Sequence, residues 1–322
     1  MNRLLLAVTA LALCFLFALR LTSVSVAIQP NPDAQVPPER SAAVEVSDNG
    51  DDGGSESADL FETQVNNWIE SLSAQKEFQS WRGAAWTRYP LGPGMHGWLV
   101  LIMKNGQEIG YLVIGSAEDN QLKLIEYGTG DKPLFSLQTL YQSMVQHELI
   151  RSYDEWLARM YEHPVAPERL YYSPLHAVWK VAAGNDWIFI DAVTGEELPL
   201  TDEAFLGLEP LQAEQSGLIA DKARLAESLS LEPADPFDDT NWITDEPLSI
   251  RTPGQLVSAV GQQRPIIYAA NLYGETVLAP FSAAGYHQWN EVLYAALAQE
   301  GAIRYMPFPI LAAYGSFFAG SQ

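Results

Sequence analysis

The stretch GWLVLIMKNGQEIGYLVIG, from Gly97 to Gly115, decides the fold of the central part of this chain. Two apolar runs flank the pair Asn105-Gly106. Both residues readily adopt the positive φ that a tight hairpin turn requires, so this arrangement predicts a β-hairpin. A third apolar run, at 122–127, follows a polar turn. The sequence therefore predicts an antiparallel meander.

An amphipathic helix is expected on the N-terminal side of this meander, because apolar residues recur at helical spacing between Leu60 and Leu72. The same order returns further along the chain. A second helix is predicted from Ser136 to Met160, with a bend, and apolar runs at 177–182 and 187–192 then predict strands. The sequence thus predicts two modules, each a helix followed by an antiparallel meander.

The C-terminal part has a different pattern. Acidic residues dominate from Thr201 to Glu246, where a helix is expected over 216–229. Thr252 is a good helix cap and Pro253 suits a first helical position. RPIIYAANLY then predicts a strand and QWNEVLYAALAQEG, 288–301, a helix. We expect a small α/β C-terminal domain, and the α+β class for the whole chain.

These patterns divide the chain into six predicted segments. The segments are 1–27, signal peptide or membrane anchor; 28–59, disordered acidic and proline-rich linker; 60–132, first helix-meander module; 133–201, second helix-meander module; 202–250, acidic linker and helix; and 251–322, C-terminal α/β domain.

The N-terminus is typical of an export signal. Sixteen apolar or small residues, 4–19, lie between Arg3 and Arg20, and Ser25-Val26-Ala27 supplies small residues at a cleavage site. The apolar run is shorter than the roughly 20 residues that span a bilayer, although residues up to 28 extend it into an uncleaved anchor. We expect an exported protein, extracellular or attached to the outer face of the cell membrane, which touches the membrane only through 4–27 if uncleaved.

Charge and cysteine content exclude several classes. The chain has 18 Lys and Arg against 40 Asp and Glu, and its net charge of −22 disfavours nucleic acid as a partner. The one cysteine, Cys14, lies in the export signal, so the exported part has neither a disulfide nor a thiol nucleophile. His147 begins a helical zinc motif, but Arg151 stands where the second histidine belongs. We predict no metal ligands and no cofactor.

The acidic stretch DAVTGEE, 191–197, has two interpretations. Asp191, Thr194, Glu196 and Glu197 offer oxygen ligands to calcium, although Ala192 and Val193 interrupt the alternation of a calcium-binding loop. In the simpler interpretation this is a turn, in which Asp191 accepts backbone amides and Gly195 takes a positive φ. We expect the turn, with Trp187 and Phe189 on one face of the preceding strand, and keep calcium as the alternative.

The hairpin ending in this turn resembles a known family. FIDAVTGE, 189–196, resembles the final strand of PepSY-type domains, and GYLVIGSAEDN, 110–120, resembles the strand and turn of streptopain-like propeptides, except that Ser116-Ala117-Glu118 replaces Ser-Gly-Asp. The resemblance covers about 97–135 and 177–200. It implies a cystatin-like helix-on-sheet fold without catalytic residues, and extracytoplasmic roles such as inhibitor, chaperone or sensor.

The best binding candidates lie in PFSAAGYHQW, 280–289, where Tyr286, His287 and Trp289 precede the predicted C-terminal helix. No catalytic residues are predicted. The sequence favours a non-catalytic extracytoplasmic protein that binds a protein or peptide partner. The alternative is an extracytoplasmic hydrolase with a site around His287.

Overall fold

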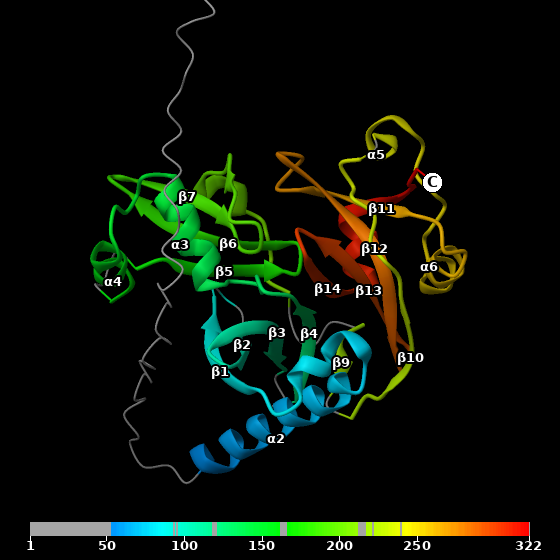
Figure 1. Ribbon diagram of the computed structural model, residues 1–322, viewed down its shortest axis with the longest axis horizontal. Coiled ribbons are helices and arrows are strands. Elements are labelled where there is room, and N and C mark those ends of the chain that lie inside the picture. Colours follow the sequence, from blue (N-terminus) through cyan, green and yellow to red (C-terminus); the bar gives the residue numbers. More distant parts are fainter. Residues whose placement is uncertain are drawn as a thin grey trace, which may run out of the picture. The chain divides into compact units, whose positions relative to one another are not determined.

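The first part of the fold is a helix followed by a four-stranded antiparallel meander. A computed structural model describes residues 53–92, 94, 96–117, 121–161, 166–211, 217–220, 222–238 and 240–321, with only the backbone of 53–58 (Figure 1). The elements of this first unit are α2 (Gly53–Ser73), the 3₁₀-helix η1 (Lys76–Trp81), β1 (Ala85–Leu91), β2 (Gly97–Lys104), β3 (Gln107–Ser116) and β4 (Leu122–Thr129). The predicted signal 1–27 lies outside the described residues, as does most of the predicted linker.

The hairpin predicted at Asn105-Gly106 is confirmed. The two residues have φ of 53° and 77°, the left-handed pair that a tight turn between twisted strands needs. Helix α2 begins seven residues earlier than the apolar spacing indicates, at Gly53, within the predicted linker. Strand β1 was not predicted, because its alternation in AWTRYPL is interrupted by Arg88 and Pro90.

The second unit repeats this order with a second sheet. Its elements are α3 (Leu137–Gln146), α4 (Tyr153–Tyr161), β5 (Glu168–Ser173), β6 (His176–Ala183), β7 (Asp186–Asp191) and β8 (Glu197–Leu198). The predicted helix start near Ser136 is confirmed, and the hydroxyl of Ser136 caps α3 by accepting the backbone N–H of Thr139. The long bent helix predicted over 136–160 is two helices, because the chain leaves the helix at His147 and Glu148 has a φ of 57°.

The C-terminal part begins with short elements and ends in a third unit. The short elements are the 3₁₀-helix η2 (Asp202–Phe205), β9 (Ile219–Ala220), β10 (Leu225–Ser230) and α5 (Asn241–Thr244). The third unit comprises α6 (Pro253–Val260), β11 (Ile266–Leu272), β12 (Val277–Trp289), β13 (Val292–Gln299), β14 (Ala302–Pro307), α7 (Phe308–Tyr314) and β15 (Gly315–Ala319). Thr252 and Gln255 form a full capping box on α6.

Two helix predictions in this part are wrong. The helix expected over 216–229 is replaced by β9 and β10, and β10 pairs with the long strand β12. The helix expected over 288–301 is the hairpin of β12 and β13. Leu293 to Leu297 are buried on both faces of the sheet, so they form a continuous apolar run that carries no alternation.

One large sheet joins the first and third units. Its strand order is β1-β2-β3-β4-β14-β13-β12-β11-β15, with β9 on β4 and β10 on β12, while β5 to β8 form a separate sheet. The separate sheet β5–β8 lies within the predicted segment 133–201, whereas strands of the large sheet lie on both sides of the predicted boundary at 250. In the described part of the chain, a helix followed by a four-stranded antiparallel meander occurs three times, and the class is α+β.

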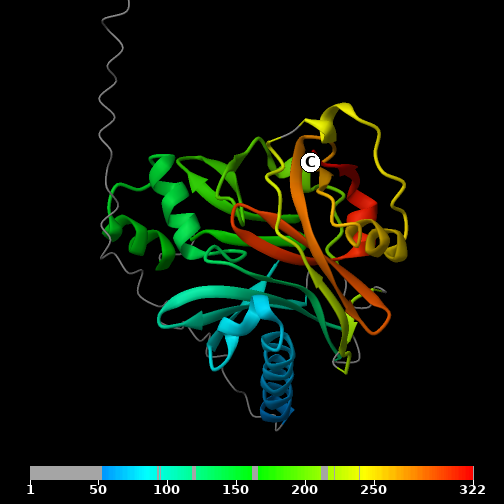
Figure 2. The same ribbon diagram turned by 45° about the vertical axis from the view of Figure 1, so that its right-hand side comes forward.

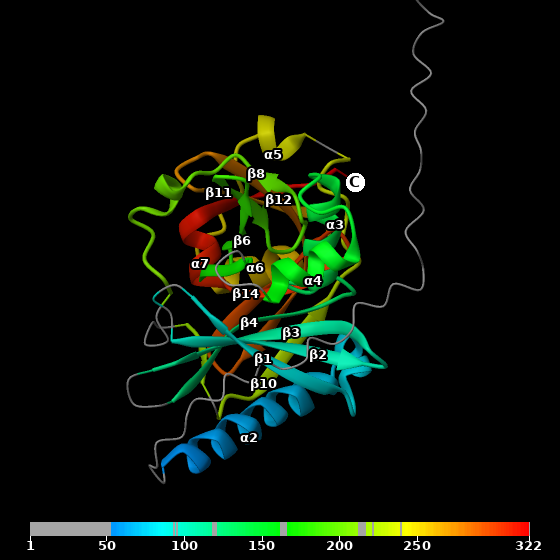
Figure 3. The same cartoon turned by 90° about the vertical axis from the view of Figure 1, so that its left-hand side faces the viewer.

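The large sheet is covered on both faces of its first half. Leu99 and Leu101 pack toward α3 and the second sheet, whereas Val100 and Ile102 pack toward α2. Figures 2 and 3 show α2 on one side of β1–β3, with α3 and the β5–β8 sheet on the other. Each such side chain stabilises the fold by about 1.5–3 kcal/mol on burial. Because of this packing, the neighbouring strands β4 and β14 of the large sheet lie in the interior of the fold.

Candidate functional site

The junction of β4 and β14 places two tyrosines directly opposite each other. Tyr127 pairs with Tyr305 in the antiparallel register, and the two rings stack at 4.9 Å with planes 6° apart. Each tyrosine follows a charged residue: the sequences are Ile125-Glu126-Tyr127 and Ile303-Arg304-Tyr305. Because neighbouring side chains on a strand point to opposite faces, Glu126 and Arg304 share the face behind the stacked rings.

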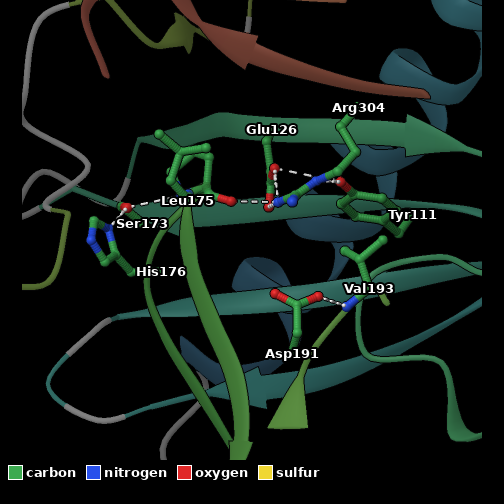
Figure 4. Close-up of polar contacts among 9 residues, drawn as sticks. Tyr111, Glu126, Ser173, Leu175, His176, Asp191, Val193 and Arg304 are labelled. Carbon is green, nitrogen blue, oxygen red and sulfur yellow. Dashed lines mark hydrogen bonds and ion pairs between the residues drawn. The ribbon is translucent and has the colours of Figure 1, made fainter. Parts of the chain in front are cut away.

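Glu126 and Arg304 form a buried ion pair on that face (Figure 4). Nη2 of Arg304 lies 3.0 Å from Oε2 and 3.3 Å from Oε1 of Glu126. Its Nε donates to the hydroxyl of Tyr111 at 3.1 Å, and Nη2 also donates to the carbonyl of Pro174. The two charged residues are 0% and 4% exposed. The guanidinium therefore connects strands β3, β4 and β14 to the turn between β5 and β6.

Burial governs the electrostatics of this cluster. It raises the pKa of the Glu126 carboxyl, an effect that Arg304 opposes. Glu126 in turn holds the pKa of Arg304 above its ordinary value, so the guanidinium stays charged and Glu126 serves as its counter-ion. Burial and Glu126 both raise the pKa of Tyr111. The Tyr171 hydroxyl lies close enough to act on Glu126, but it does not meet hydrogen-bond geometry. The cluster is suited to a structural role, which is to hold strands β3, β4 and β14 and the β5–β6 turn together.

A serine–histidine pair lies in the β5–β6 turn beside this cluster. The hydroxyl of Ser173 is 2.9 Å from Nδ1 of His176 and accepts the backbone N–H of Leu175 at 3.3 Å. The imidazole lies between the rings of Tyr273 and Tyr314. Burial lowers the pKa of His176 to about 4. Among the described residues no carboxylate hydrogen-bonds to this imidazole, so the pair closes a turn and has no third group of a catalytic triad there.

The predicted binding residues Tyr286, His287 and Trp289 are not brought together at one surface. Side chains on β12 alternate between the two faces of the sheet. Tyr286 therefore packs in the cluster that includes residues of α6 and β11, while His287 and Trp289 face the stacked tyrosines. The hydroxyl of Tyr286 donates to Glu227, and burial together with this carboxylate raises the pKa of Tyr286 to about 12. Tyr286 is thus already engaged by a residue of β10.

His287 is fully buried and neutral. Its Nδ1 lies 2.8 Å from the Tyr127 hydroxyl, which also accepts the indole N–H of Trp289 at 2.8 Å. The indole only donates, so the Tyr127 oxygen accepts from Trp289, whereas the tautomer of the imidazole sets which group donates between Tyr127 and His287. The other ring nitrogen of His287 is Nε2. That atom has no hydrogen-bond partner among the described residues. Burial lowers the pKa of His287 to about 4. A buried imidazole of this kind does not favour hydrolysis.

The stretch 191–197 forms the predicted turn. Oδ1 of Asp191 accepts the backbone N–H groups of Val193 at 2.9 Å and Thr194 at 2.8 Å, and Gly195 has a φ of 75°. The ammonium of Lys180 lies over the rings of both Trp187 and Phe189, which places these two on one face of β7.

Within the described ranges, no group of three or more His, Cys, Asp or Glu side chains is placed to hold a metal ion. Nδ1 of His147 lies 3.0 Å from Oε2 of Glu197. None of the helices described is long and apolar enough to cross a bilayer.

The sequence reasoning missed Glu126, Arg304, Ser173 and His176. The matching tripeptides Ile-Glu-Tyr and Ile-Arg-Tyr at the ends of two meanders were the available signal. In comparisons with known proteins, no family model, no curated protein and no solved structure matches the chain.

Proposed function

We propose that this chain is a non-catalytic extracytoplasmic protein that binds a protein or peptide partner, as an inhibitor, chaperone or sensor does. The observation that carries the proposal is the helix-and-meander order in 60–132 and 133–201, with α2 and α3 each packed on antiparallel strands. This order is what the resemblance to PepSY-type domains and streptopain-like propeptides implies. Modules of that kind present surfaces and loops and carry no catalytic residues.

The state of the polar residues supports binding over catalysis. Glu126 and Arg304 neutralise each other in the interior, His176 closes a turn, and His287 is buried under aromatic rings. A hydrolase needs a nucleophile or an activated water that substrate can reach. None of these groups meets that requirement, so the hydrolase alternative at His287 gains no support.

Export remains part of the proposal. It rests on the apolar segment 4–19 and the small residues at 25–27, which lie outside the described residues, and on the net charge of −22. An acidic chain without a thiol in its exported part suits the outside of the cell.

A capture experiment tests the proposed function. The full chain with an affinity tag is expressed in its source cells, cross-linked, and purified from the exported fraction with and without calcium. The recovered partner is then purified and titrated against the chain by calorimetry. We expect saturable binding with a Kd of about 1 μM or tighter, which corresponds to about −8 kcal/mol. Failure to recover any partner that rebinds would overturn the proposal. So would hydrolysis of peptides or esters by the purified chain that the His287→Phe variant abolishes.

A further inference from the structure

The described residues around α5, 235–238 and 240–246, include two large apolar side chains that are exposed. Phe237 is 70% and Ile243 is 62% exposed. The indole of Trp242 donates to the carbonyl of Pro236 at 2.8 Å, so the residues directly preceding Phe237 and Ile243 are held together. Single exposed apolar residues are ordinary on protein surfaces, whereas exposed apolar residues gathered in a patch with a polar rim mark interaction sites.

This loop is anchored to the sheet. On its N-terminal side the backbone N–H of Ala234 donates to the hydroxyl of Ser282 on β12. Within the loop the side-chain amide of Asn241 donates to the carbonyl of Ala319, and after it Leu248 donates to Phe317, both on β15. Figures 1 and 3 show α5 at the end of the described unit remote from α2. An anchored loop loses little entropy on binding, which favours recognition.

The charged residues that neighbour these two side chains in the sequence all have one sign. The carboxylates of Asp235, Asp238, Asp245 and Glu246 flank them, and all four residues are exposed. Between Arg224 and Arg251 the sequence contains no Lys or Arg. The surface is therefore an apolar centre with an acidic rim, and its complement is an apolar groove with a rim of Lys and Arg.

We propose that residues 235–238 and 240–246 form the docking surface for the partner, and that this partner is a protein whose apolar groove is edged by Lys and Arg and receives Phe237 and Ile243. The inference rests on the proposed function, since it names the surface and partner class of the same binding activity. Anionic membrane surfaces are disfavoured by the same carboxylates.

The test uses the full chain and a defined probe, a synthetic amphipathic helix of leucine and lysine whose apolar face is edged by lysines. Binding is measured by fluorescence anisotropy at several salt concentrations, and hydrogen–deuterium exchange locates the site. The double variant Phe237→Ser/Ile243→Ser is expected to weaken binding about tenfold or more. The matched control is Leu206→Ser/Leu278→Ser, which removes two other exposed apolar side chains, 80% and 53% exposed, and is expected to bind within about twofold of the unmodified chain.

A second variant separates charge from apolar contact. Asp238→Asn/Glu246→Gln keeps the apolar pair and is expected to reduce the salt dependence of binding. We expect slowed exchange over 231–250 in the complex. Three outcomes would overturn the proposed docking surface. The first is equal binding by the two serine double variants, and the second is slowed exchange only outside 231–250. The third is no binding of the probe by the unmodified chain. If a captured natural partner binds the Phe237→Ser/Ile243→Ser variant unchanged, this inference fails while the proposed function stands.

Discussion

Glu126 and Arg304 occupy equivalent positions on two strands that meet in antiparallel pairing. Each precedes by one residue a tyrosine of the stacked pair Tyr127 and Tyr305, and the antiparallel register relates the two strands by a local two-fold rotation. The rotation superimposes the carboxylate position on the guanidinium position. Like charges at such related positions would repel, so opposite charges there allow the first and third units to join in one buried sheet.

Removing one member of this pair is expected to destabilise the fold strongly. Arg304→Met leaves Glu126 buried without a counter-ion, which costs about 3–5 kcal/mol of the free energy of unfolding. The double variant Glu126→Leu/Arg304→Met should recover most of that loss, because neither charge remains. Urea unfolding followed by circular dichroism measures both. Asp202→Asn, which breaks the exposed Lys180–Asp202 pair, is the control and should cost less than about 1 kcal/mol. If Arg304→Met is as stable as Asp202→Asn, the Glu126–Arg304 pair does not stabilise the junction of β4 and β14.

Acidification is expected to destabilise the fold through His176 and His287. Burial lowers the pKa of each imidazole from 6.5 to about 4 in the folded chain. Between these values the unfolded chain binds protons that the folded chain does not, so stability present above pH 6.5 is lost as the pH falls toward 4. At pH 5 each histidine contributes about 2 kcal/mol to this loss.

The histidine variants His287→Phe and His176→Phe check this prediction. The difference in the free energy of unfolding between pH 7 and pH 5, from urea titrations, should shrink by about 2 kcal/mol in each variant. A control is His96→Phe, since His96 is exposed. An unchanged pH dependence in both buried variants would mean that these imidazoles are solvated in the folded chain.

The Tyr127 hydroxyl is expected to contribute more to the free energy of unfolding than the Tyr294 hydroxyl does. In Tyr127→Phe the indole of Trp289 and the imidazole of His287 both lose their partner in the interior, at a cost of about 2 kcal/mol or more. Tyr294→Phe loses the hydrogen bond to the carbonyl of Leu124, at a cost of about 1 kcal/mol. Thermal unfolding of the two variants gives the comparison. If the two variants lose equal stability, the hydrogen bonds that link Trp289, Tyr127 and His287 do not stabilise the fold as expected.

Alanine at Gly195 is expected to destabilise more than alanine at Gly184. Both glycines have positive φ, 75° and 68°, so both substitutions strain the backbone. An added Cβ at Gly195 would also lie 2.8 Å from Cγ2 of Thr139, whereas nothing lies within 4 Å at Gly184. We expect about 1 kcal/mol for Gly184→Ala and at least about 1 kcal/mol more for Gly195→Ala, measured by urea unfolding. Identical losses would mean that α3 does not pack against this turn.

Local signals in the sequence predicted local structure well. The Asn105-Gly106 turn, the Thr252 cap and the Asp191 turn each depend on a few neighbouring residues, and each is found. The helix expected over 288–301 was wrong because Leu293 to Leu297 are buried on both faces of a central strand. Such a run has no alternation, so periodicity alone does not distinguish it from a buried helix.

The polar cluster was not predicted because it depends on distant parts of the chain. Arg304 and Glu126 are 178 residues apart in sequence, and only the pairing of β4 with β14 brings them together. His287 stood out in the sequence as a polar residue near aromatic ones. Its burial follows from which face of β12 it occupies, and that face is set by the pairing register.

The measurement that tests the central claim most directly is a calorimetric titration of the purified full chain with the partner recovered from the exported fraction. The account predicts saturable binding with one partner per chain, a Kd of about 1 μM or tighter, and an intact partner afterwards. Absence of saturable binding, or a partner cleaved or chemically changed by the chain, would contradict it.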